Sequence, residues 1–437
     1  MGEEGTQLKR VLRMRDLVAF AIMTMVPIAP MGIYGIIAMV SHGYVPTSYL
    51  IAAVAMFFTA WAYGQFAFRF PKAGSVYAYV RETLGPHVGF MAGWVILLDY
   101  ILIPALVILV SALWLQAMSG VPMLVWAFAF VIGATILNIL GVELTAKASM
   151  ALFIFEVAVL GVFVGAAVYK IVTDPNLTFS LAPFYNPSTF NWSLVLAGAS
   201  IAVLSFLGFD IMTTLAEETK EARKVVSRAV VLVIPLIAAF FVIQTYLGAL
   251  IHPGYDFQDP DVAFYYIAKE AGGEWVQMLT MLGTVVAWGV GDTLAAQAGI
   301  SRILFSMGRQ GHLPAVFAKI HPKYKTPYVS TIIVALITAP LLYLLTLTDL
   351  SSLVNFGALT AFALLNVALA YRFLRIENKP ALAIMPAIGF VVTALVWYGL
   401  NMMAKELGIA WILVGVIYLA YVTKGFKVKT RLSLPEI

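Results

Sequence analysis

The chain has 437 residues, of which 62% are apolar and 11% are charged. Soluble globular chains are nearer half apolar and a quarter charged, and disordered chains are rich in polar residues, so both classes are excluded. A membrane-spanning helix needs roughly 20 apolar residues, and twelve such helices with short connections would use about 400 residues. The composition therefore predicts an all-α integral membrane protein without a sizeable soluble domain.

The sequence contains no cysteine, and its five histidines stand near predicted loops without metal-ligand spacing. Disulfides are therefore excluded, and neither a metal nor a cofactor is predicted. The phosphate-binding loop of ATPases and the spacing of a catalytic triad are both missing, so we do not expect an enzyme. The net charge of +5 is typical of a membrane protein with basic cytoplasmic loops, and no nucleic-acid partner is predicted.

Apolar runs between charged or Gly/Pro-rich breaks predict twelve helices. In chain order they cover residues 17–40, 48–70, 88–118, 123–141, 148–170, 194–216, 229–251, 275–306, 328–347, 351–371, 382–400 and 406–423. Residues 1–16 and 424–437 are interpreted as cytoplasmic tails, the first because it lacks the apolar core of a signal peptide.

The distribution of basic residues predicts the orientation of these helices. With both termini in the cytoplasm, every Lys and Arg except Lys170, Lys269 and Lys405 falls on the cytoplasmic side. Cytoplasmic loops retain positive charge, so this distribution supports a multi-pass protein of the cytoplasmic membrane with both ends inside.

The first and sixth helices are interrupted in their middle. The interrupting residues are Pro27, Pro30, Gly32 and Gly35 in the first, and Ser205, Gly208 and Asp210 in the sixth. Proline removes a backbone donor and glycine permits non-helical angles, so both helices should unwind near the membrane centre. Paired interrupted helices, five apart, are typical of inverted-repeat transporters, although Pro and Gly can also merely kink a membrane helix.

Several segments resemble the amino acid–polyamine–organocation superfamily. They are GYVPTSYL with FPKAGSVYAYV in residues 43–100, SFLGFDIMTTLAEET at 205–219, SRILFSMGRQGHLP at 301–314, HPKYKTP at 321–327 and LVNFGALTAFALLN at 353–366. Within the superfamily, GYVPTSYL, PHVGFMAGW with LLDY, and NFGAL look most like bacterial putrescine importers. The similarity covers nearly the whole chain.

This resemblance implies a LeuT-like fold with a five-plus-five inverted repeat. Residues 17–170 and 194–371 would form the two repeats of a transport core, 17–371, with residues 382–423 as two peripheral helices. Substrate would lie between the broken helices and helices 3, 8 and 10. One departure concerns Gly32, because the putrescine importers carry an aspartate at the corresponding position.

The candidate substrate-binding residues come from four of these helices, the first, third, sixth and eighth. They are Ile28, Ala29, Pro30, Gly32, Tyr34, Asp99, Tyr100, Ser205, Phe206, Gly208, Phe209, Asp210 and Trp288. Asp99 lies twelve residues after His87, about 18 Å along a helix and hence near the membrane centre. It could pair with a substrate ammonium, or serve as a structural hydrogen-bonding group.

Asp210 and the aromatic candidates also have ordinary structural interpretations. Asp210 could contact substrate, but capping of the inner half of helix 6 is favoured. The aromatic rings could pack on an ammonium group or simply fill the core. Free N–H groups at the helix breaks would accept a carboxylate if the ligand is an amino acid.

Glu156 in helix 5 and Asp292 in helix 8 are the candidate proton-coupling residues. The resemblance places both near the broken helix 1, and several proton-coupled relatives carry a lysine at the helix-5 position. A glutamate in apolar surroundings could exchange a proton near neutral pH, and the second carboxylate would favour one shared proton. The alternative is that Glu156 donates to a backbone carbonyl and Asp292 merely faces a polar cavity.

The sequence as a whole predicts a secondary active transporter that imports a small amine with protons. The intramembrane carboxylates favour a cationic substrate, with putrescine or another polyamine first and an amino acid second. The predicted partners are thus the amine or amino acid, protons and the lipid bilayer. A passive channel or a sensor on the same fold is the remaining alternative.

Overall fold

The computed structural model describes residues 10, 12–70, 75–142, 146–309 and 313–426, so most of the two predicted tails lies outside the described residues. The described residues form helices, apart from loops and one isolated β-bridge. Ten of these helices are long and apolar enough to cross a membrane, and one bent pair makes an eleventh span. The predicted all-α, multi-pass class is confirmed, whereas the count of twelve stays a prediction.

Every predicted helix has a counterpart in the structure. In chain order these are α1 (Met14–Thr24) with α2 (Ala29–Ser41), α3 (Val45–Arg69), α5 (Pro86–Ser119), α6 (Met123–Leu140), α7 (Ala146–Thr173), α8 (Trp192–Ala202), α9 (Ala222–Ile251), α11 (Glu274–Thr284) with the π-helix η6 (Val285–Asp292) and α12 (Thr293–Arg309), α13 (Tyr328–Leu344), α14 (Leu347–Tyr371), α15 (Pro380–Tyr398) and α16 (Met402–Val422). At 17 residues, α13 is shorter than the other candidate spans.

Two further helices were not predicted, α4 (Val76–Leu84) and α10 (Ala263–Gly272). Each is too short to span a membrane, and each carries charged residues on one side, so neither appears as an apolar run. Gly85 separates α4 from α5 with φ 93°, a left-handed angle that favours glycine.

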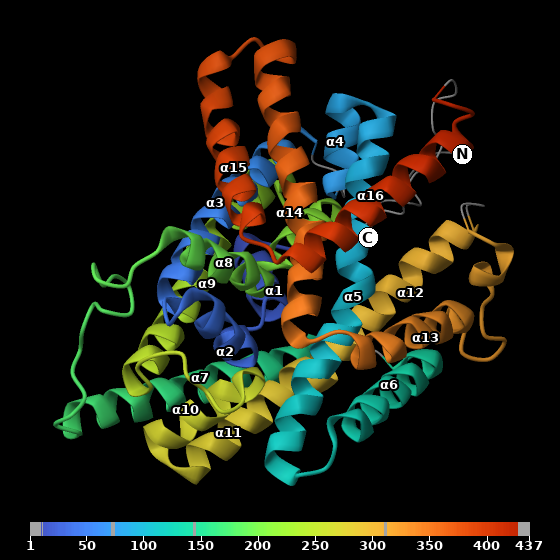
Figure 1. The fold of residues 1–437 in the computed structure, drawn as a ribbon. Coiled ribbons are helices and arrows are strands. Elements are labelled where there is room, and N and C mark those ends of the chain that lie inside the picture. The colour runs from blue at the N-terminus through green and yellow to red at the C-terminus, as the bar shows by residue number, and fades with distance from the viewer. Residues whose placement is uncertain (1–9, 11, 71–74, 143–145, 310–312, 427–437) are drawn as a thin grey trace.

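Helices α3 and α9 pack along each other over much of their length. Their close approach needs Gly64, because a Cβ at that position would lie 2.7 Å from the Ser227 carbonyl oxygen. Elsewhere in the bundle, α14 packs between α5 and α15, while α6, α12 and α13 form one group and α7, α10 and α11 another (Figure 1). The buried core is thus made of helix faces.

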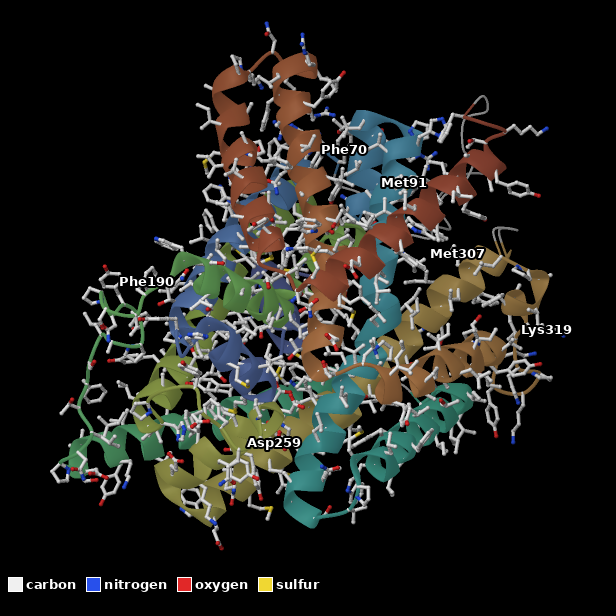
Figure 2. The ribbon with its side chains drawn as sticks, in the orientation of Figure 1. Phe70, Met91, Phe190, Asp259, Met307 and Lys319 are labelled. Atoms are coloured by element: carbon white, nitrogen blue, oxygen red, sulfur yellow. The ribbon has the colours of Figure 1, made fainter. Side chains whose placement is uncertain are left out.

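The connection between α9 and α11, residues 252–272, covers one end of the bundle. It contains the 3₁₀-helix η5 (Pro260–Val262) and α10, and both pack against α2. Figure 2 shows Asp259 of this connection near the bottom of the view and Phe70, which follows α3, near the top. The 252–272 connection and the α3 C-terminus therefore lie at opposite ends of the molecule.

Candidate functional site

A cavity of about 260 Å³ opens between the two interrupted helices and α5, η6, α12 and α14. Among the described residues, its wall contains three carboxylates, those of Asp99, Asp210 and Asp292, and no Lys, Arg or His. The rest of the wall is largely apolar. A cavity with this charge inside a membrane protein is suited to a cation, because buried carboxylates need a positive partner or a proton.

The first interruption lies between α1 and α2, whose axes differ by 50°. Residues 25–28 separate the helices, and Val26 adopts φ 51°, which is unusual for a β-branched residue. The carbonyl oxygen of Pro27 accepts a hydrogen bond from Gln244 Nε2 of α9 at 2.9 Å. The break therefore contains the predicted Pro27, whereas Pro30, Gly32 and Gly35 lie within α2. Proline is tolerated in the first turn of α2, because backbone N–H groups there have no acceptor within the helix.

The second interruption follows α8. The chain continues as a 3₁₀-helix, η2 (Val203–Phe206), then an extended Leu207, and a second 3₁₀-helix, η3 (Phe209–Thr213). Gly208 has φ 101°, and a Cβ there would lie 2.8 Å from Thr24 Cγ2. The second interruption therefore touches the last residue of α1, just before the first interruption, and both backbone angle and space require glycine at this position.

Asp99 projects from α5 toward the second interruption. Its side chain is 4% exposed, and its Oδ1 has no hydrogen-bond partner among the described residues. The backbone on its far side is covered by α14, since a Cβ at Gly357 would lie 3.1 Å from Asp99 N. An unpaired buried carboxylate oxygen that lines a cavity is a site for a ligand donor.

Asp210 lies across the cavity from α5 and is close enough to Asp99 for the two carboxylates to interact electrostatically. Its Oδ2 accepts a hydrogen bond from Tyr63 OH of α3 at 3.1 Å. The N-cap position of η3 is Gly208. Asp210 is thus held by a phenol from another helix, with Tyr100 of α5 also near it.

Asp292 lines the cavity from η6, where the chain winds as a π-helix. The Thr293 hydroxyl donates to the Trp288 carbonyl oxygen, five residues back, at 3.0 Å. Trp288 and Asp292, four residues apart in η6, both lie on the cavity wall. Short π-helical segments occur frequently at functional sites.

Glu156 lies behind Asp292, on α7, and does not line the cavity. It is 4% exposed, its Oε2 has no partner among the described residues, and it interacts electrostatically with Asp292. The structure therefore brings together the two residues that the sequence proposed as a proton-coupling pair. One of them is exposed to the cavity and the other is buried behind it.

The cavity includes some of the predicted substrate-binding residues and not others. On its wall are Ala29, Asp99, Tyr100, Ser205, Gly208, Asp210 and Trp288. The residues that do not line it are Ile28, Pro30, Gly32, Tyr34, Phe206 and Phe209.

The non-lining residues pack in the core instead. Tyr34 contacts Phe264 of the 252–272 connection, with ring centroids 5.5 Å apart. A Cβ at Gly32 would lie 3.0 Å from Val110 Cγ1 and 3.3 Å from the Trp288 ring, so α2 contacts α5 and η6 closely there.

Sequence reasoning missed two polar side chains that support the site, Tyr63 and Gln244. Tyr63 is one of several aromatic residues in α3, and nothing in the sequence separates it from the others. Gln244 did carry a signal, because an amide inside an apolar helix needs a partner. Thr24 and Met25 also line the cavity, and they lie just before Pro27, the first of the prolines that predict the interruption.

Comparison with known proteins places the chain in a family. Residues 17–400 match the family model described as amino acid permease. The low-affinity putrescine importer PlaP of Escherichia coli (strain K12) is 32% identical over 433 residues, which cover 96% of this chain and 95% of that protein. The branched-chain amino acid permease BcaP of Bacillus subtilis (strain 168) is 27% identical over 448 residues, which cover 96% of this chain and 94% of that protein. The Arabidopsis thaliana cationic amino acid transporter 6, chloroplastic, is 27% identical over 395 residues, which cover 84% of this chain and 66% of that protein.

These matches confirm the resemblance to the amino acid–polyamine–organocation superfamily, and they identify a transporter rather than an enzyme. The matched region extends from α1 through the last residues before α16, so it contains both interruptions and the whole cavity wall. The chain belongs to the amino acid permease family.

Proposed function

We propose that this permease is a secondary active transporter that imports a small amine, driven by protons. The observation that carries the proposal is the cavity wall, in which three carboxylates stand among apolar residues and, within the described part of the chain, no basic side chain. Bringing an ammonium group next to such carboxylates offsets the cost of keeping them charged in a low-dielectric site. A zwitterion would leave its own carboxylate without a cationic side chain to pair with.

Putrescine or a related polyamine is the leading substrate. The carboxylates form two groups, Asp99 with Asp210 at the second interruption and Asp292 on the π-helix. A diamine would supply one ammonium group to each of these two groups of carboxylates. The putrescine importer PlaP, as a relative of this chain, is consistent with that choice.

The fold around the cavity is proposed to be the five-plus-five repeat. Residues 17–170 and 194–371 form the repeats, residues 382–423 the peripheral helices, and both termini face the cytoplasm of a bacterial-type inner membrane. The cavity wall includes Ser75, Thr214 and Ile303, whereas the 252–272 connection packs over the other end of α2. With this orientation the structure corresponds to an inward-facing state of an alternating-access cycle.

An amino acid is the second candidate substrate. Trp288 Nε1 is a buried donor with no partner among the described residues, and Trp288 lines the cavity. It could donate to a substrate carboxylate, which putrescine lacks. BcaP, a branched-chain amino acid permease by name, is also a relative.

Competition experiments on the purified protein separate these substrates. We expect putrescine to raise the apparent melting temperature and to displace a labelled amine, because a ligand that binds the folded state stabilises it. Alanine serves as the zwitterionic probe. Displacement by alanine without displacement by putrescine would reverse the order of the two candidates.

Proton coupling is tested with Glu156→Gln, which keeps the size of the side chain and removes its titration. In proteoliposomes, we expect this variant to lose accumulation driven by a pH gradient while it retains substrate exchange. Glu406→Gln is the matched control, because Glu406 is exposed at the start of α16. Normal gradient-driven accumulation by Glu156→Gln would refute the coupling role. Absence of accumulation in the unmutated protein would favour a channel or a sensor.

A further inference from the structure

Two buried side chains from α3 and α9 hold the two interruptions. Gln244 of α9 bonds to the first, and Tyr49 of α3 bonds to the second. Both side chains are 0% exposed, and neither lines the cavity. They act on the cavity wall only through the segments that they hold.

The contact at the first interruption is a double hydrogen bond from one amide group. Gln244 Nε2 donates to the Pro27 carbonyl oxygen at 2.9 Å and to the Phe240 carbonyl oxygen of its own helix at 2.9 Å. The Pro27 carbonyl has left the helical pattern, so without Gln244 it would be a buried acceptor without a partner. Leaving such a group unpaired costs about 1–3 kcal/mol.

The contact at the second interruption positions a cavity residue directly. The Tyr49 hydroxyl and Ser205 Oγ lie 2.9 Å apart in a buried hydrogen bond. Ser205 is part of the cavity wall. Its hydroxyl direction is therefore set by a residue outside the cavity.

Aromatic packing joins these two contacts. The Phe241 ring, on the same helix as Gln244, lies 5.6 Å from the Tyr49 ring and 5.0 Å from the Phe206 ring. Phe206 follows Ser205 in η2. Helix α9 thus links the two contacts, since it carries Gln244 at the Pro27 carbonyl and, three residues earlier, Phe241 against the Tyr49 ring.

We propose that Gln244, Phe241 and Tyr49 form a bridge that fixes the two interruptions relative to each other, with Gln244 and Tyr49 as positioning residues for substrate binding. This inference rests on the proposed transport function. If the bridge loses either end, the Pro27 carbonyl or the Ser205 hydroxyl can turn, and the wall no longer presents a single geometry to substrate. The bridge predicts that the two ends are energetically coupled.

A double-mutant cycle tests the bridge. The variants are Tyr49→Phe, Gln244→Met and the two combined, and the measurement is the Kd for putrescine and for alanine. We expect each single variant to raise the Kd of the bound probe by about tenfold, as the loss of one buried hydrogen bond suggests. We expect the Kd of the double variant to increase by less than the product of the two single-variant increases.

The chain supplies a matched control for each substitution. Tyr44→Phe removes a hydroxyl that bonds to Thr189 at 2.6 Å, away from both interruptions. Thr245→Val removes a buried hydroxyl next to Gln244 that bonds within its own helix, to Phe241 O at 2.7 Å. Both controls should leave the Kd unchanged within about twofold, even if they lower the melting temperature. Gln244→Glu replaces Gln244→Met if the latter does not fold.

A second measurement does not depend on the substrate. Because the native chain has no cysteine, Thr214→Cys gives one reactive thiol on the cavity wall. We expect Tyr49→Phe and Gln244→Met to change its rate of modification by a small maleimide at least threefold, with no change in the controls. Unchanged rates, or unchanged Kd values, would overturn the bridge. If the unmutated protein binds neither probe, the substrate proposal fails and the thiol rates alone decide on the bridge.

Discussion

At the scale of single residues, α2 packs closely against the 252–272 connection at Gly35. A Cβ at this position would lie 2.1 Å from the Pro260 carbonyl oxygen and 2.5 Å from Ala263 Cβ. Real atoms do not approach so closely, so any side chain at residue 35 must push the connection away from α2. The absence of a side chain is what permits this end of the molecule to close.

We therefore expect Gly35→Ala to slow uptake by about tenfold, because overpacking of this kind costs about 1–3 kcal/mol in the closed arrangement. Uptake of labelled amine into proteoliposomes measures the effect. Gly133→Ala is the control, since a Cβ at Gly133 has no neighbour within 4 Å. Equal uptake by the two variants would show that the contact at Gly35 does not limit transport.

Asp261, also in the 252–272 connection, makes the packing of this connection depend on pH. Burial and the neighbouring Asp259 raise the pKa of Asp261 to about 6. The packed arrangement therefore favours the protonated carboxyl. This contribution to stability is complete below the ordinary pKa of an aspartic acid and is lost as the pH rises through about 6.

We expect the melting temperature of the native protein to fall, relative to that of Asp261→Asn, as the pH rises from 4.5 to 6.5. The difference should then be constant from pH 7 to 8. His42 and His252 are present in both proteins, so their contributions cancel in the comparison. Thermal unfolding in detergent across this range is the measurement, and a difference that does not vary with pH would contradict the assignment.

At the scale of elements, an ion pair joins the last residue of α3 to the segment that follows α14. Glu377 accepts from Arg69 Nη2 at 2.9 Å and from Arg372 Nε at 3.0 Å, and its side chain is 17% exposed. The Arg69 guanidinium also lies over the Phe373 ring at 4.8 Å. Because these hydrogen bonds favour the carboxylate, the pKa of Glu377 falls to about 2.

Glu377→Gln should lower the free energy of unfolding by about 2 kcal/mol, since it weakens hydrogen bonds to charged groups and leaves Arg69 without a counter-charge. The native contribution is present above the ordinary pKa of a glutamic acid and is lost only as the pH falls through about 2. The difference between variant and native protein should therefore be constant from pH 5 to 8.

Lys379→Gln is the control for this ion pair. Lys379 Nζ lies 3.6 Å from Glu377 and its side chain is 58% exposed, so its removal should change stability by less than about 0.5 kcal/mol. Denaturant titration of both variants compares the two values. Comparable losses would mean that the burial of the Arg69–Glu377 pair contributes nothing.

The elements also show what the sequence could and could not predict. Apolar length alone places the spans, because the bilayer sets the length that a helix needs. The interrupted helices were recognised from glycine and proline, but the first break lies at 25–28 and Val26 takes the left-handed angle. The π-helix that carries Trp288 and Asp292 has no sequence pattern of its own.

Residue pairing was the least predictable part of the site. Asp99, Glu156, Asp210 and Asp292 were selected because a buried carboxylate is costly in a membrane, and the structure places three of them on one cavity wall. The Tyr63–Asp210 and Gln244–Pro27 hydrogen bonds join residues more than 140 positions apart. Such partners follow from the tertiary fold, which composition and spacing do not encode.

At the scale of the whole molecule, α16 is fastened to the core by two tryptophans. Trp94 of α5 donates to the Trp411 carbonyl oxygen at 2.9 Å, and Trp411 donates to the Trp94 carbonyl oxygen at 2.8 Å. Their rings stack 4.6 Å apart, and Gly415 leaves room for the Trp94 ring. The proposed peripheral helices therefore include one that is firmly attached to α5.

The orientation of the whole molecule can be tested because the chain has no native cysteine. Asp256 in the 252–272 connection and Lys319 before α13 are both exposed, and the proposed topology places Asp256 outside and Lys319 inside. A membrane-impermeant maleimide should label Asp256→Cys in intact cells and Lys319→Cys only after permeabilisation. The reverse pattern would invert the molecule, so that the cavity would face outward in this structure. If both thiols are labelled in intact cells, both positions lie outside. The chain would then cross the membrane an even number of times between them, which contradicts the proposed topology and its repeats.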